Sequence, residues 1–112
     1  MEIIKLDLNL TNNTTYFVDY DSHMLLEGII TKEENVYCSI CTEINLVTEG
    51  ITKEESIKNL LEAVKDYIEI AVEKNLPIYR PVPLEDNPLI NDKENIIEIF
   101  KIETNVNLLE YV

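Results

Sequence analysis

The sequence has no tryptophan, two glycines and four prolines among its 112 residues. So little glycine and proline excludes a collagen-like or long low-complexity chain. No stretch approaches the roughly 20 consecutive apolar residues of a membrane-spanning helix, and the N-terminus lacks the pattern of a secretory signal. We therefore expect a cytoplasmic protein, with no membrane contact, whose two cysteines stay reduced.

Basic residues are also scarce. Nine lysines and arginines stand against 22 acidic residues, which gives a net charge of −13. Nucleic-acid binding relies on basic side chains that displace counterions from phosphates, so direct binding to DNA or RNA is not expected. The charge favours a basic protein partner or a cation; alternatively, it only keeps the protein in solution. The length predicts one domain over residues 1–112.

Residues 1–22 are interpreted as an N-terminal β extension. Apolar side chains alternate with polar ones from Ile4 to Leu10, which predicts a half-buried strand. An Asn-rich turn follows, because Asn tolerates the backbone angles of a turn. A returning strand is predicted over Tyr16–Tyr20. The pair would form an N-terminal hairpin.

Three further strands are predicted before the middle of the chain. Met24–Thr31 and Val36–Ile44 are β-prone and joined by a polar turn, so they predict a hairpin. A short apolar strand is expected over Leu46–Thr48. Gly50 follows it, where the chain can turn sharply.

A long helix is predicted to begin at Thr52. Thr52 and Glu55 fit a capping box, in which each side chain bonds the backbone N–H of the other residue. Apolar residues then recur at helical spacing from Ile57 to Ala71. The helix should end near Asn75, because Pro77 disfavours the helical conformation at the residue before it.

The remaining chain predicts extended structure. Residues 77–95 hold all four prolines and should be extended and irregular, and residues 96–102 should form a final strand. Strands, one helix and a last strand predict an α+β fold. We expect a two-layer αβ sandwich, in which one long helix packs on one face of an antiparallel sheet.

The sequence offers little catalytic chemistry. Cys38 and Cys41 form a C-x-x-C pair inside a predicted strand, where residues three apart point to opposite faces, so neither a disulfide nor a zinc site is expected. Asp21, Ser22 and His23 are the residue types of a catalytic triad, but a triad needs them to converge from separate elements. We predict no catalytic, metal or cofactor-binding residues, and no enzyme.

Residues 36–64 hold Cys41 and Glu43 at the end of a predicted strand, Gly50 at a turn, and a helix start at Thr52. This pattern resembles the HicB family of antitoxins and their stand-alone relatives. That family has a strand ending near Cys-Pro-Glu-Leu, a short strand, a Gly turn, and a helix opening with Thr-x-Glu-Glu-Ala. The hairpin and the Pro-containing segment are also similar, so residues 24–76 would form the HicB-like core. Thr42, Glu49 and Ser56 replace the usual Pro, Gln and Ala. The matching positions are Cys41, Glu43, Gly50, Thr52, Glu54, Glu55, Asn59, Leu60, Glu62 and Ala63.

The resemblance implies a degraded ribonuclease-H-like fold and a protein-binding function. The implied partner is a small, basic, RNA-cleaving toxin of the HicA type, which the antitoxin inhibits by covering its active surface. Glu43, Glu49 and Glu54 are the candidate contact residues, from their positions in the motif. The family often adds a DNA-binding domain, but too little chain follows Ile102 to hold one, so operator binding is not expected.

Two other hypotheses remain open at this point. The chain could be a stand-alone HicB-like domain without a toxin, which forms a homodimer or higher homo-oligomer through an exposed sheet edge. An enzyme or small-ligand binder would need a clustered set of acids or a metal site, and the sequence gives no sign of either.

Overall fold

The computed structural model describes residues 2–12, 23–74 and 76–110. The part of the chain it describes contains no helix that is long and apolar enough to cross a membrane. In chain order the elements are β1 (Ile3–Asn12), β2 (His23–Glu33), β3 (Val36–Cys41), β4 (Leu46–Gly50), α1 (Lys53–Glu73), the 3-10 turn η1 (Leu84–Asp86), α2 (Pro88–Asn91), the 3-10 turn η2 (Lys93–Asn95) and β5 (Ile96–Glu110).

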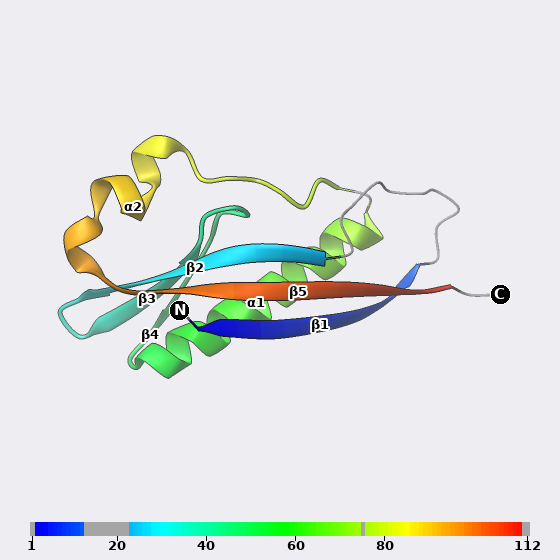
Figure 1. Cartoon of the computed structure of the whole chain (residues 1–112), viewed down its shortest axis with the longest axis horizontal. Helices are drawn as coiled ribbons and strands as arrows, with labels where there is room; N and C mark the ends of the chain where they lie inside the picture. The colour runs from blue at the N-terminus through cyan, green and yellow to red at the C-terminus, as the bar shows by residue number, and fades with distance from the viewer. Residues whose placement is uncertain (1, 13–22, 75, 111–112) are drawn as a thin grey trace.

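The strands form one sheet in the order β1-β5-β2-β3-β4 (Figure 1). β2 runs antiparallel to both β5 and β3, and β3 runs antiparallel to β4. β1, however, pairs with β5 in parallel, with Ile4 opposite Ile102. The expected antiparallel sheet is therefore wrong at this edge. Alternation along a strand indicates which face is buried, but it does not select the neighbouring strand.

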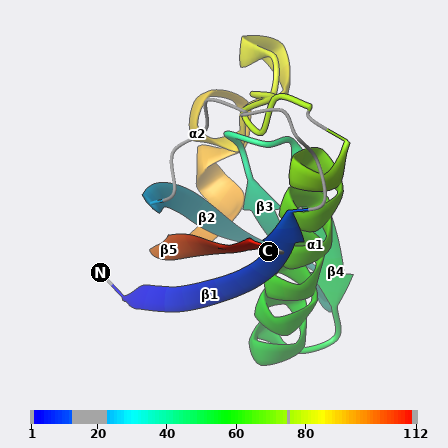
Figure 2. The same cartoon turned by 90° about the vertical axis from the view of Figure 1, so that its right-hand side faces the viewer.

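The sheet curls around α1, as the end-on view shows (Figure 2). α1 packs mainly against β4 and β3 and also reaches β1. The α+β architecture, with one long helix on one face of the sheet, is confirmed. The predicted hairpin partner of β1 at Tyr16–Tyr20 lies outside the described residues.

The core lies between α1 and the inner face of the sheet. Leu8 of β1 is 1% exposed, so the N-terminal strand contributes directly to this core. Large side chains of α1 and the central strands are also completely buried there, among them Leu26, Ile30, Leu60, Val64, Ile68, Phe100 and Ile102.

α1 begins and ends close to the predicted positions. Thr52 accepts a hydrogen bond from the backbone N–H of Glu55 at 3.0 Å, which confirms Thr52 as the N-cap. The helix ends at Glu73, with Lys74 as its C-cap. Gly50 is required for space: a Cβ atom there would crowd the backbone N–H of Ser56, where β4 turns into the helix.

A buried pair of hydroxyl groups joins α1 to the sheet. Ser56 Oγ donates to the carbonyl of Lys53 at 2.8 Å, and Ser39 Oγ lies 2.8 Å from Ser56 Oγ. Because the one proton of Ser56 is already used, Ser39 is the donor in that pair. Thr48 Oγ1 donates to the carbonyl of Ser56 at 2.9 Å. The hydroxyl of Ser56 therefore links the helix to β3, and its backbone carbonyl links the helix to β4.

The Pro-containing segment is only partly irregular, which corrects the prediction for residues 77–95. Its first part is extended, and the N–H groups of Arg80 and Val82 donate to the carbonyls of Glu43 and Thr42, each at 2.8 Å. The chain then forms η1, α2 and η2. Asn87 caps α2 through a 3.0 Å bond from the N–H of Leu89, and Pro88 occupies a first-turn position that suits proline.

Two strand ends also differ from the prediction. β3 stops at Cys41, three residues earlier than expected, because residues 42–45 turn and Asn45 adopts a positive φ of 52°. Asn is among the few residues that tolerate this conformation. β5 continues eight residues beyond Ile102, because β1 pairs with it as far as Glu110.

Gly28 gives a test of the central packing. It lies opposite Phe100 on the neighbouring strand, and a Cβ atom at Gly28 would overlap the Phe100 ring. We expect Gly28→Ala to lower the free energy of unfolding by about 1–3 kcal/mol through overpacking, as measured by urea denaturation. In a Phe100→Leu background the same change should cost less, because the ring is gone. Equal costs in the two backgrounds would contradict this packing.

Candidate functional site

The structure does not bring the three predicted contact residues together. Glu43 lies in the turn between β3 and β4, and Glu49 lies near the other end of β4. Glu54 is exposed in the first turn of α1, on the helix side of the sheet. Glu49 is paired with Cys38 on β3 and points to the outer face. A partner that touches all three would have to extend around the β4 edge.

Glu43 is part of the internal structure of its turn. Its Oε2 atom accepts the backbone N–H of Glu27 at 2.8 Å, and its Oε1 atom accepts the hydroxyl of Thr42 at 3.3 Å. Its carbonyl also accepts the N–H of Arg80. Glu43 thus ties the β3–β4 turn to β2 and to the Pro-containing segment. A substitution there would disturb the fold as well as any partner contact.

Glu49 lies in a shallow depression of the outer face, which we call the acidic hollow. Thr31, Cys38 and Glu49 form a cross-strand row over β2, β3 and β4. The volume of the hollow is about 680 Å³. The hollow is lined by Lys32, Glu33, Glu34, Val36, Cys38, Glu49 and Asn95.

Residues far apart in the sequence close one side of the acidic hollow. Asn95 of η2 donates to Glu33 Oε1 at 3.1 Å and to Asp92 Oδ1 at 2.7 Å. The bond to Glu33 holds η2 against the β2–β3 turn, and the bond to Asp92 is internal to the η2 segment. Lys32 is the one base that lines the hollow, and its ammonium lies over the Tyr37 ring, 5.2 Å from the centroid. The hollow therefore presents mainly negative charge.

The negative charge of the hollow affects the pKa of the Cys38 thiol. Burial raises its pKa first, and Glu49 raises it next, with smaller contributions from Glu33 and Asp92. A hydrogen bond with Thr31 acts in the opposite direction. Because three carboxylates disfavour the thiolate, the acidic hollow is a site of negative potential that would attract a cation or basic side chain.

Cys41 and Cys38 point to opposite faces of the sheet, as predicted. Cys41 is completely buried, whereas Cys38 is partly exposed on the outer face. Burial, followed by the charge of Glu43, raises the pKa of Cys41 to about 12. Neither thiol is activated as a nucleophile, because both favour the protonated form.

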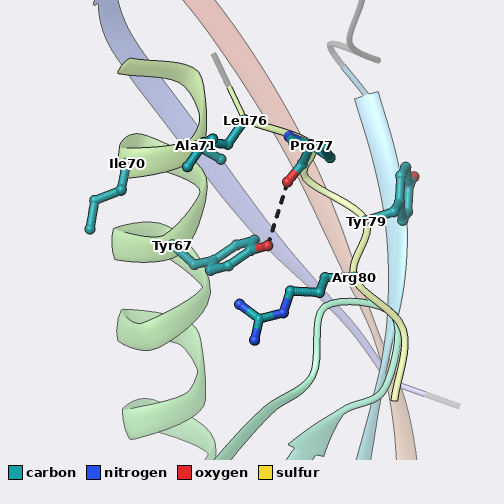
Figure 3. Close-up of a pocket in the computed structure, with 7 residues that line it drawn as sticks. All are labelled: Tyr67, Ile70, Ala71, Leu76, Pro77, Tyr79 and Arg80. Carbon is teal, nitrogen blue, oxygen red and sulfur yellow. Dashed lines mark hydrogen bonds between the residues drawn. The ribbon is translucent and has the colours of Figure 1, made fainter. Parts of the chain in front are cut away.

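A second depression, which we call the apolar pocket, lies at the C-terminal end of α1 (Figure 3). Its volume is about 380 Å³. The hydroxyl of Tyr67 donates across it to the carbonyl of Pro77 at 3.5 Å, and the Arg80 side chain extends toward the helix beneath Tyr67. The lining residues are Tyr67, Ile70, Ala71, Leu76, Pro77, Tyr79 and Arg80.

Sequence reasoning missed most of both depressions. The sequence pattern predicts only a polar turn at Glu33 and Glu34 and only an irregular segment at Asp92 and Asn95. The apolar pocket joins a helix to a segment whose path the sequence did not predict. In the sequence, these regions differ from the rest only in being rich in acidic residues and proline. Neither feature predicts which residues lie next to one another in the folded chain.

Of the three triad-type residues of the sequence, only His23 lies within the described residues. His23 Nε2 lies 3.1 Å from Glu103 Oε1 on the neighbouring strand, while Asp21 and Ser22 lie outside the described residues. Within the described ranges, no group of three or more His, Cys, Asp or Glu side chains is placed to hold a metal ion.

Comparisons with protein-family models, with curated proteins and with solved structures gave no match to this chain.

Cys38 provides a direct test of the potential in the acidic hollow. Glu49→Gln should lower the pKa of Cys38, because it removes the largest charge that disfavours the thiolate. The pH profile of Cys38 alkylation, localised by mass spectrometry, should shift to lower pH and give faster reaction at mildly alkaline pH. Glu62→Gln on the exposed face of α1 is the matched control and should not shift the profile. An unchanged profile for Glu49→Gln would exclude this electrostatic coupling.

Proposed function

We propose that this chain is a non-enzymatic, HicB-like protein-binding module that neutralises a small, basic, RNA-cleaving toxin. The observation that carries the proposal is the acidic hollow, which gathers Glu33, Glu34 and Glu49 around Cys38 on the outer face. A basic RNA-binding surface would be attracted to such a site.

The order of elements supports the resemblance on which the proposal rests. From β2 to β5 the chain forms a hairpin, a short strand, a turn at Gly50, a long helix, a Pro-containing segment and a strand. This is the order that the HicB-like motif implies. The resemblance lies in residues 36–64, and the physical roles of Gly50, Thr52 and Leu60 are those the motif requires.

The mechanism that fits this arrangement is occlusion. The toxin's basic side chains would approach the hollow, and the bound module would then cover the surface that contacts RNA. Charge complementarity of this kind speeds association and selects the partner more than it adds affinity. No bond-making step by this chain is needed.

Glu49 is the strongest of the three predicted contact residues under this proposal. It is exposed and lines the hollow, whereas the Glu43 carboxylate already binds the backbone of Glu27. Glu54 could contribute only at the margin of the interface, because it lies on the helix side. Glu33 joins Glu49 as a proposed contact residue.

The test is co-purification of the tagged protein from its native cell, followed by mass spectrometry. We expect a small basic protein in stoichiometric amount. The double charge reversal Glu33→Lys/Glu49→Lys should slow its association about tenfold or more at low salt. The matched control is Glu62→Lys/Asp66→Lys on the exposed face of α1, which changes net charge equally and should keep the complex.

Undiminished binding after the Glu33/Glu49 reversal would reject the acidic hollow as the partner site. Equal loss in both double variants would mean that only net charge matters. Recovery of the protein alone would count against the antitoxin hypothesis and favour the second candidate.

The second candidate is a stand-alone domain that associates with itself through β1. β1 stands at one end of the described sheet and spans ten residues, and long unpaired edges readily pair with another chain. The carbonyl of Glu2 accepts the N–H of Lys101 on β5 at 2.9 Å. By alternation, the N–H and C=O groups of Lys5 point away from β5, toward the side of β1 on which the described residues form no strand.

Lys5→Pro tests this candidate. Proline removes an outward N–H without removing a bond to β5, a position at which edge strands tolerate it. If β1 forms the contact, sedimentation velocity should show a dimer that becomes a monomer in Lys5→Pro but persists in Lys5→Ala. A protein that is monomeric before substitution, or a dimer unaffected by Lys5→Pro, would eliminate the β1 contact.

A further inference from the structure

We infer that the apolar pocket binds a small aromatic carboxylate, with Arg80 as the group that pairs with its negative charge. This site is separate from the acidic hollow: it lies at the C-terminal end of α1, whereas the hollow lies at the β2–β3 turn, at the other end of the sheet (Figure 1). The inference therefore does not depend on the proposed function.

The pocket has the size and lining of a ligand site. Its volume of about 380 Å³ falls in the range of about 300–1,000 Å³ that is usual for small-molecule sites, which are mostly apolar with a few polar groups. Ile70 and Leu76 keep 48% and 49% of their surface exposed. Both line this pocket, so a ligand there would cover apolar surface that the fold leaves in water.

Arg80 favours a negatively charged ligand. It is the only arginine in a chain with 22 acidic residues, yet its guanidinium forms no ion pair or hydrogen bond with any other residue that the structure describes. Figure 3 shows it directed toward α1, below the Tyr67 ring. A guanidinium group binds a carboxylate through two parallel N–H···O bonds.

The backbone holds Arg80 in place for this role. Its N–H donates to the carbonyl of Glu43 at 2.8 Å, and two residues later Val82 bonds Thr42 in the same way. These main-chain bonds fix the backbone from which the Arg80 side chain extends. A substitution that changes only the side chain leaves these bonds available.

The Tyr67 ring favours an aromatic ligand. Tyr67 lines the pocket beside Arg80, whereas the Tyr79 ring is directed away from both (Figure 3). An aromatic ring contributes stacking energy in addition to the area it buries. The Tyr67 hydroxyl bonds the carbonyl of Pro77 at 3.5 Å, which is long for an O–H···O bond. It can turn to donate to a carboxylate at little cost.

The test uses a charged and a neutral probe of nearly the same shape, naphthylacetate and naphthylethanol. Titrations of the full chain are followed by NMR, with the Tyr67 and Tyr79 ring resonances as reporters. We expect both probes to shift these resonances and naphthylacetate to bind more tightly. Arg80→Gln should weaken naphthylacetate about tenfold, the order of one lost charge-assisted contact, and should leave naphthylethanol unchanged.

Lys74→Gln is the matched control. It removes one positive charge at the nearby end of α1, from a residue that does not line the pocket, so it should not affect either probe. The Arg80→Gln spectrum away from the pocket verifies the fold. Absence of shifts at both tyrosines would overturn the inference. It would also be overturned if Arg80→Gln and Lys74→Gln weakened naphthylacetate equally, or if Arg80→Gln weakened both probes alike.

Discussion

The structure depends on β5 lying between β1 and β2. β5 pairs with β2 in antiparallel and with β1 in parallel, so the last strand joins the first strand to the hairpin. Phe100, Ile102 and Thr104 on its inner face are completely buried, and Thr104 donates its hydroxyl to the carbonyl of Met24 at 3.2 Å. The ring of Phe100 lies over Gly28, the one position of β2 without a side chain to obstruct it. These contacts join residues separated by most of the chain, so their loop-closure entropy must be offset by burial.

The segment between α1 and β5 supplies residues to both surface depressions. Arg80 and Tyr79 near its beginning line the apolar pocket, and Asn95 near its end lines the acidic hollow. Main-chain bonds from Arg80 and Val82 hold it to the β3–β4 turn, and Asn95 holds it to Glu33. The segment thus connects two depressions of different character, one lined mainly by acidic residues and one mainly by apolar residues.

Several residues of the HicB-like motif have clear structural roles in this fold. Gly50 is needed where β4 turns into α1, Thr52 caps the helix, and Leu60 is completely buried beneath it. Each of these roles follows from local sterics or burial, and a different family with the same turn would share them. Ser56 adds a hydroxyl pair with Ser39, which compensates the polar groups buried at the helix–sheet contact.

The sequence alone determined the elements whose cause is local. Alternation predicted β1, a β-prone run before a polar turn predicted β2, the capping box predicted the start of α1 at Thr52, and the position of Pro77 predicted its end. These signals act within a few residues. Strand parity also placed Cys38 and Cys41 on opposite faces. Only the tertiary structure decided that β1 pairs with β5, that Glu43 bonds the backbone of Glu27, and that Glu33, Glu49 and Asn95 share one hollow while Tyr67 and Arg80 share one pocket. The physical reason is that strand partners and surface clusters arise from packing between distant segments, which no local pattern of residues specifies.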